Sequence, residues 1–226
     1  MIVAERKPME EILAMTEDFE RILVLGCGGC TAVCFAGGAR EVEMLSTLIR
    51  MDRKQRGKPV GTVEALTEMQ CEPQSVKPLL AKLEGQYDVV LSMACGAGVQ
   101  TVAQLFPNQR VFPALNTNFT GMAEEHGVWK ELCLACGDCI LDRTGGICPV
   151  TRCAKGLLNG ACGGASEGMC EVSKDLPCAW QQIYHALKRL DLLSYLKEKP
   201  KVKSWPVHPG RVVREDLREV AATEVD

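Results

Sequence analysis

The thirteen cysteines of this chain constrain its fold more than any other feature, because most of them stand in short-spaced groups beside glycines. Their number is odd, and the charged residues from Met1 to Pro8 lack the apolar run of an export signal. A secreted disulfide scaffold is typically shorter, carries such a signal and pairs its cysteines. We therefore expect a cytoplasmic protein whose cysteine thiolates bind metal.

The remaining composition is that of a globular protein. Hydrophobic residues make up 46% of the chain and aromatic residues only 5%, so we expect a core of aliphatic side chains. The formal net charge is −3, and no basic stripe with interleaved aromatics occurs, so we expect no nucleic acid partner. No segment approaches the roughly 20 apolar residues of a membrane span, so we expect none.

Four apolar runs typical of β-strands alternate with helical patterns in the first part of the chain. The runs span residues 21–26, 60–66, 87–93 and 110–115. Such alternation predicts an α/β fold with an open, mainly parallel, Rossmann-like sheet covered by helices. We expect this domain to span residues 1–125.

The alternation then stops, and the chain becomes rich in glycine and cysteine. We expect a cysteine-rich metal-binding module over residues 126–182, followed by a C-terminal helix and extended tail over 183–226. Apolar side chains at helical spacing predict an amphipathic helix over 179–196, whose stripe packs either on a partner or on the module itself. The prolines and Trp205 of the tail favour an extended segment that binds another protein surface.

The first cysteine group follows the predicted strands. Cys27, Cys71 and Cys95 each come directly after a strand, and the carboxyl ends of parallel strands share one edge of a sheet. Cys30 and Cys34 extend Cys27 into a C-x2-C-x3-C motif, in which flanking glycines let the backbone wrap a cluster. We predict a 4Fe–4S cluster held by Cys27, Cys30, Cys34 and Cys95. Cys71 is the spare candidate, and a small buried hydrophobe is an equal alternative for it.

The same glycine-rich turn has a second interpretation. Gly26-Cys27-Gly28 after a strand resembles the start of the dinucleotide fingerprint G-x-G-x-x-G, but Thr31 stands where the third glycine belongs. A nucleotide-dependent oxidoreductase is therefore the weaker alternative.

A second group of eight cysteines lies between residues 133 and 178. It begins with a C-x2-C-x2-C motif, continues with Cys148-Pro149, and ends with four further cysteines: Cys133, Cys136, Cys139, Cys148, Cys153, Cys162, Cys170 and Cys178. Three closely spaced cysteines and a Cys-Pro pair favour a second 4Fe–4S cluster, although spacing does not assign Cys148. The last four suit a third cluster or tetrahedral zinc equally well. Zinc alone would make the chain a structural adaptor.

No catalytic constellation is evident. The three histidines, His126, His185 and His208, form no pair at ligand spacing, and no P-loop or Ser/His/Asp arrangement occurs. The sequence thus predicts a carrier of electrons rather than a catalyst.

Three segments of the second group resemble a known family. They are Gly146-Ile-Cys-Pro-Val-Thr-Arg-Cys-Ala-Lys-Gly-Leu-Leu-Asn-Gly-Ala-Cys-Gly-Gly164, Gly168-Met-Cys-Glu171 and Cys178-Ala-Trp-Gln-Gln-Ile-Tyr184. This pattern is similar to the cysteine-rich methylenetetrahydrofolate reductase C-terminal family. Together with Cys27, Cys30 and Cys34 it resembles the small, MetV-type subunits of that reductase.

The resemblance implies a role that spacing alone does not. It implies a non-catalytic iron–sulfur subunit whose partner, a flavin-containing MetF-type subunit, reduces methylenetetrahydrofolate. The flavin is then expected in the partner rather than in this chain. Heterodisulfide-reductase-like electron-transfer proteins are further expected partners, and the resemblance also allows zinc in the C-terminal module.

Overall fold

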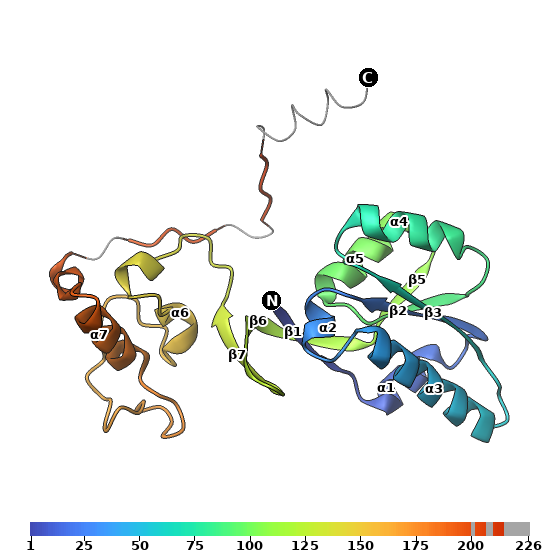
Figure 1. Ribbon diagram of the computed structural model, residues 1–226, viewed down its shortest axis with the longest axis horizontal. Helices are drawn as coiled ribbons and strands as arrows, with labels where there is room; N and C mark the ends of the chain where they lie inside the picture. Colours follow the sequence, from blue (N-terminus) through green and yellow to red (C-terminus); the bar gives the residue numbers. More distant parts are fainter. Residues whose placement is uncertain (200–201, 207–209, 215–226) are drawn as a thin grey trace. The chain divides into compact units, whose positions relative to one another are not determined.

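The computed structural model describes residues 1–199, 202–206 and 210–214. The chain divides into two compact units, Met1–Cys133 and a second unit from Leu134 onward (Figure 1). The predicted boundary after residue 125 falls inside a β-hairpin that continues to Cys133. None of the helices in the described part of the chain has the length and apolar character needed to cross a membrane.

A four-stranded parallel sheet organises the first unit and confirms the predicted α/β class. Its strand order is β3-β2-β4-β5, with β2 Arg21–Cys27, β3 Gly61–Thr67, β4 Val89–Ser92 and β5 Arg110–Pro113. Strand β2 is buried from Ile22 to Cys27, as expected of a strand covered on both faces.

Helices cover both faces of this sheet. They are α2 Cys30–Val33, α3 Ala39–Gln55, α4 Pro73–Lys82 and α5 Gly96–Leu105. Alternate residues of β2 point to opposite faces. Ile22 and Val24 pack with residues of α3, whereas Leu23 and Leu25 pack with residues of α4 and α5. The first unit therefore has two apolar layers that need no metal.

A second, antiparallel sheet was not predicted. It has the order β1-β6-β7, with β1 Ile2–Arg6, β6 Leu115–Glu125 and β7 Val128–Cys133, and α1 Met9–Thr16 follows β1. Only Val3 and Ala4 of β1 are buried, and β6 is mostly exposed. Both strands therefore lack the long apolar runs by which the other strands were recognised.

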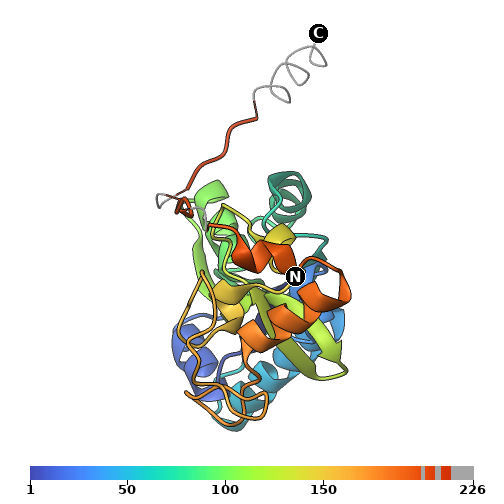
Figure 2. The same cartoon turned by 90° about the vertical axis from the view of Figure 1, so that its left-hand side faces the viewer.

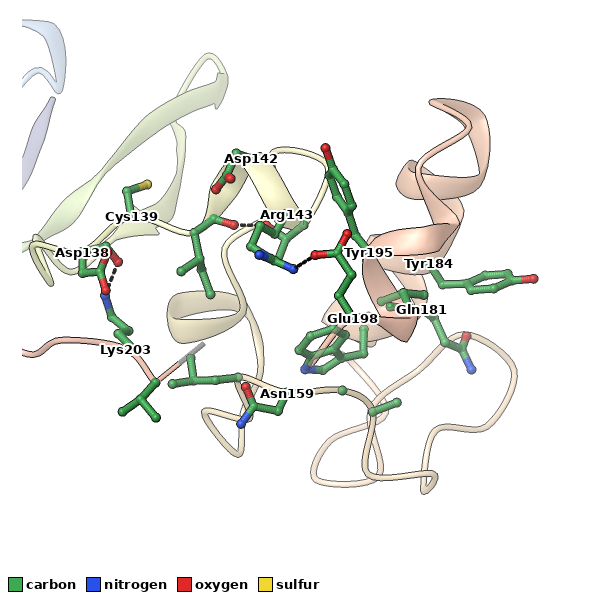
Figure 3. A pocket seen from close by; sticks show the side chains of 18 residues that line it. Asp138, Cys139, Asp142, Arg143, Asn159, Gln181, Tyr184, Tyr195, Glu198 and Lys203 are labelled. Atoms are coloured by element: carbon green, nitrogen blue, oxygen red, sulfur yellow. Dashed lines mark hydrogen bonds and ion pairs between the residues drawn. The ribbon is translucent and has the colours of Figure 1, made fainter. Parts of the chain in front are cut away.

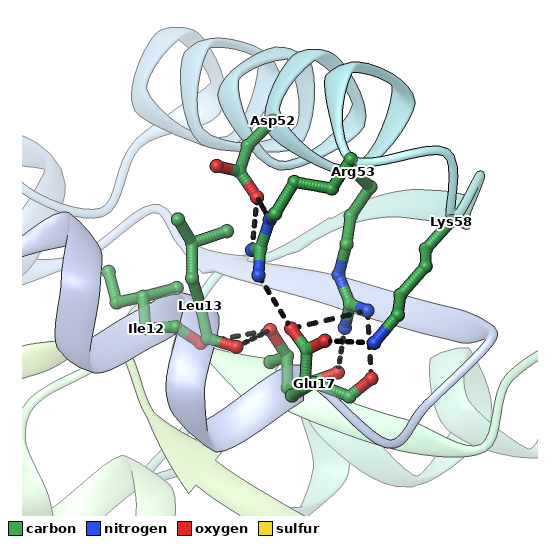
Figure 4. A network of polar contacts seen from close by, with 8 residues as sticks. Ile12, Leu13, Glu17, Asp52, Arg53 and Lys58 are labelled. Carbon is green, nitrogen blue, oxygen red and sulfur yellow. Dashed lines mark hydrogen bonds and ion pairs between the residues drawn. The ribbon is translucent and has the colours of Figure 1, made fainter.

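A polar network holds the end of α1 against α3 (Figure 4). The guanidinium of Arg53 is almost fully buried and donates hydrogen bonds to the carbonyl oxygens of Thr16 and Glu17. The Glu17 carboxylate forms ion pairs with Arg53, Arg56 and Lys58. Because α1 has no cationic residue in its last turn, Arg53 supplies the donors that its final carbonyls need.

The second unit consists mainly of loops (Figure 2). Its elements are η1 Leu141–Arg143, α6 Pro149–Arg152, α7 Ala179–Arg189 and η2 Leu193–Lys197. The predicted helix over 179–196 ends early, because Asp191 takes a positive φ of 58°. Trp180, Ile183 and Leu187 form the core of this unit, so these residues of the apolar stripe pack on the module itself, whereas Tyr184 and Leu190 remain exposed.

Candidate metal centres

Four cysteines of the first unit lie where the parallel strands end. Cys27 is the last residue of β2, Cys71 follows β3, and Cys95 precedes α5, while Cys30 begins α2. The N–H of Cys27 donates to the carbonyl of Gly37 at 2.8 Å. Because the strands run parallel, these cysteines lie toward the carboxyl edge of the sheet.

Burial and three neighbouring cysteines raise the pKa of the Cys71 thiol. Partial burial is the largest cause that raises the pKa of the Cys71 thiol. The thiols of Cys95, Cys27 and Cys30, in that order, raise this pKa further because a neighbouring thiolate opposes ionisation. Cys71 is nevertheless exposed to solvent, so its alternative as a buried hydrophobe is wrong.

Cys34 has a different environment. Its side chain is only 5% exposed and packs in the core layer beneath α3. The thiol lies 3.4 Å from the carbonyl oxygen of Ala4 in β1 and 3.5 Å from that of Thr31, and can donate to either. Burial is the main cause that raises the pKa of this thiol, and Cys30 adds a smaller effect. Cys34 thus contributes to packing between α2 and β1.

Gln70 positions Cys71, a role that sequence analysis missed. This side chain is fully buried, and its amide nitrogen donates to the carbonyls of Leu25 at 2.7 Å and Gly26 at 3.1 Å. Its amide oxygen accepts a hydrogen bond of 2.6 Å from Ser92. These hydrogen bonds hold Gln70, the residue before Cys71, against the ends of β2 and β4. A single glutamine after a strand carries no recognisable sequence signal.

The backbone at Gly37 and the backbone at Met93 lie very close together at this edge of the sheet. A Cβ atom at Gly37 would lie 1.9 Å from the carbonyl oxygen of Met93, so only glycine fits there. The Thr31 hydroxyl donates to the same Met93 carbonyl at 3.1 Å. These contacts join the turn after α2 to the segment that carries Cys95.

Four cysteines of the second unit line one small cavity. Its volume is about 20 Å³, and Cys153, Cys162, Cys170 and Cys178 all border it. Cys153 follows α6 and Cys178 precedes α7. The backbone N–H groups of Cys170 and Cys178 donate to the carbonyls of Leu176 and Gly168. The thiol of Cys162 donates to Glu171 at 3.3 Å.

The other cysteines of the second group are divided between the units. Cys133 ends β7 in the first unit, whereas Cys136, Cys139 and Cys148 belong to the second. Within the described residues, no three His, Cys, Asp or Glu side chains stand in an arrangement that could hold a metal ion. Metal binding at any of these groups would therefore require thiol side chains to turn toward one another.

A larger cavity of about 570 Å³ lies beside Cys139 in the second unit (Figure 3). Trp180, Tyr184 and Tyr195 contribute aromatic side chains to it. The two cationic side chains that line it already have partners. Arg143 forms an ion pair with Glu198, and Lys203 donates to the Asp138 carbonyl.

Comparison with known proteins bears on the C-terminal part of the chain. Residues 112–206 match the family model described as Methylene-tetrahydrofolate reductase C terminal. This part of the chain is similar to that family, and the match covers less than half of the chain. The matched residues begin in β5 and include all eight cysteines of the second group. The comparisons with curated proteins and with solved structures gave no match.

Proposed function

We propose that this chain is an iron–sulfur electron-transfer and scaffold subunit of a methylenetetrahydrofolate reductase complex. Its partner would be a MetF-type catalytic subunit that carries the flavin, with heterodisulfide-reductase-like proteins as further partners. The observation that carries the proposal is the gathering of Cys27, Cys30, Cys71 and Cys95 at one sheet edge. A bound 4Fe–4S cluster supplies one-electron transfer. The family match supports the reductase context.

The arrangement favours Cys71 over Cys34 as the fourth ligand. Cys71 is exposed and within electrostatic range of the other three thiols. Cys34 is buried with its thiol beside the carbonyl of Ala4 in β1, whereas Cys27, although also buried, lies at the sheet edge where β2 ends. The sequence-based set of Cys27, Cys30, Cys34 and Cys95 is therefore revised in this proposal by one residue.

Matched serine variants test this assignment. Purified without oxygen, the Cys71→Ser chain should lose about four irons, the content of one cubane cluster, together with its EPR signal. Cys34→Ser should keep its iron and lose only stability, because a hydroxyl replaces a buried thiol. Loss of iron from Cys34→Ser with full retention in Cys71→Ser would reverse the assignment.

The second unit supports a structural metal as a further part of the function. Four cysteines line a cavity of about 20 Å³, although their thiols would have to turn toward one another to hold an ion. Four cysteinates with a single ion are typical of structural zinc. Elemental analysis of Cys170→Ser should then show less zinc and unchanged iron. If the unaltered chain contains zinc and no iron, the zinc-binding adaptor replaces the electron-transfer subunit as the function.

The nucleotide-dependent alternative receives little support from the fold. In dinucleotide-binding folds a long helix begins at the glycine-rich turn and directs its N-terminus at the phosphates. Here the helix at that place, α2, is only four residues long. Tight binding of NAD or flavin by the purified chain would revive this alternative.

A further inference from the structure

The cavity of about 570 Å³ in the second unit is lined by three aromatic rings (Figure 3). They belong to Trp180, Tyr184 and Tyr195. The indole N–H of Trp180 donates to the carbonyl of Leu157 at 2.9 Å, so the polar atom of this ring already has a partner. A cavity of this size with aromatic walls is typical of a site that binds a ligand.

Carboxylates outnumber cationic side chains around the cavity. Asp138, Asp142 and Glu198 line it, together with Arg143 and Lys203. Three carboxylates and two cations give the lining a formal charge of −1. Such a lining disfavours an anionic ligand unless its cations are free to bind one.

Arg143 already has partners from its own chain. Its guanidinium forms an ion pair with the Glu198 carboxylate and lies 5.7 Å from the centre of the Tyr195 ring. A carboxylate and a ring face are both favourable neighbours for a cation. The cavity thus binds one guanidinium of the chain itself.

Lys203 has partners as well. It is only 8% exposed, and its ammonium donates to the carbonyl oxygens of Asp138 and, at 3.4 Å, Cys136. The centre of the Trp205 ring lies 5.1 Å from the same ammonium. The tail, predicted to bind another protein, contacts its own chain here. Both cations of the cavity are therefore occupied by groups of this chain.

Asp142 and Asn159 of the cavity have no polar partner within the described part of the chain. Asp142 is exposed and takes part in none of the ion pairs there. The Asn159 side chain is also exposed and forms no hydrogen bond within the described residues. A carboxylate and an amide oxygen are acceptors, so both suit a ligand that carries N–H donors.

We propose that this cavity binds an organic cation, a guanidinium or ammonium group carried on an apolar body. The carboxylate of Asp142 and the amide oxygen of Asn159 accept hydrogen bonds from the cationic group, and the rings of Trp180 and Tyr184 pack against the apolar body. An arginine or lysine side chain of another protein and a free amine share this chemistry. The inference involves no metal and is independent of the proposed function.

Binding of three probes to the full-length chain, measured by calorimetry, tests the proposal. The probes are agmatine, the blocked peptide acetyl-Leu-Arg-Leu-amide, and the same peptide with neutral citrulline in place of arginine. Agmatine and the arginine peptide should bind, and the citrulline peptide should bind at least about tenfold more weakly because it lacks the charge. Tighter binding of the arginine peptide would assign the cavity to a protein segment, and tighter binding of agmatine would assign it to a free amine.

Three variants locate the site. Asp142→Asn removes the unpaired carboxylate and should weaken binding by about tenfold, whereas Asn159→Asp adds a carboxylate and should strengthen it. Asp175→Asn is the control, because Asp175 is an exposed aspartate of the same unit outside the cavity. All three side chains are exposed, so the variants should fold.

Several results would overturn the proposal. Equal affinity for the arginine and citrulline peptides would show that the charge is not recognised. Failure of all three probes to bind would show that the cavity has no such ligand. Equal affinities in Asp142→Asn and Asp175→Asn would place the bound cation outside this cavity. The iron and zinc content of the chain decides none of these results.

Discussion

The two units place their cysteines in opposite settings. In the first unit, the candidate ligands end strands of a sheet whose two faces are already filled by aliphatic side chains. In the second unit, the buried apolar cluster consists of Trp180, Ile183 and Leu187, and cysteines line a small cavity. The first unit therefore has an apolar core of its own, whereas under the proposed function the second unit depends on metal to order its loops.

The backbone conformations of the glycines also differ between the two units. Seven glycines of the second unit adopt a positive φ, compared with three in the first. Ordering such loops costs much backbone entropy and brings little apolar burial in return. The comparison predicts that the two units depend differently on metal, on core packing and on pH.

Removal of metal should have the largest effect. Structural zinc contributes on the order of 10 kcal/mol to the folding of small domains. After chelation of the full chain, amides over 149–189 should lose their protection from hydrogen exchange, while those of β2 and β4 should keep it. Full protection of both units in metal-free protein would contradict the difference between them.

A core truncation should affect the first unit alone. Leu25 of β2 is fully buried and packs with residues of α4, so Leu25→Ala should lower the free energy of unfolding of this unit by about 2–5 kcal/mol. Leu48 of α3 is 38% exposed, so Leu48→Ala is the control. It should change the free energy of unfolding by less than about 0.5 kcal/mol. Thermal unfolding followed by hydrogen exchange resolves the units, and an equal loss in the second would show that they fold together.

Gln70→Leu should weaken metal binding in the first unit and leave the second unit unchanged. It leaves the carbonyls of Leu25 and Gly26 without the amide donor, at a cost of about 1–3 kcal/mol. Iron should leave the first site faster because Cys71 loses its anchor, while metal in the second unit stays. Gln74→Leu, on the exposed side of α4, is the control. Iron loss at the same rate in both variants would contradict the role of Gln70.

The smallest effect should be a pH dependence confined to the first unit. A hydrogen bond from Lys58 is the main cause that lowers the pKa of Glu17, and the charges of Arg53 and Arg56 lower it further. A lowered pKa in the folded state stabilises the fold above the usual glutamate range, and this stabilisation disappears as the pH falls through the folded-state pKa. Glu17→Gln should therefore flatten the acid side of the stability curve slightly. A curve of unchanged shape, measured by urea unfolding against pH, would show that the network contributes nothing.

The parallel sheet could be predicted, but the antiparallel one could not. Strands β2 and β4 are continuous apolar runs, a signal that is local in the sequence. Strands β1 and β6 are held by pairing partners more than 100 residues apart, such as Val3 and Phe119, and each is only partly buried. Their pairing depends on the folded sheet, so no local pattern indicates it.

The residues of the candidate sites were likewise only partly predictable from the sequence. The sequence by itself determined that cysteines would end parallel strands and would crowd the C-terminal part, because both follow from residue order and strand direction. Only the tertiary structure decided that Cys34 lies in the core while Cys71 is exposed, and that Lys203 contacts Asp138. These outcomes depend on which side of a turn a side chain leaves and on contacts between distant segments, which spacing along the chain does not encode.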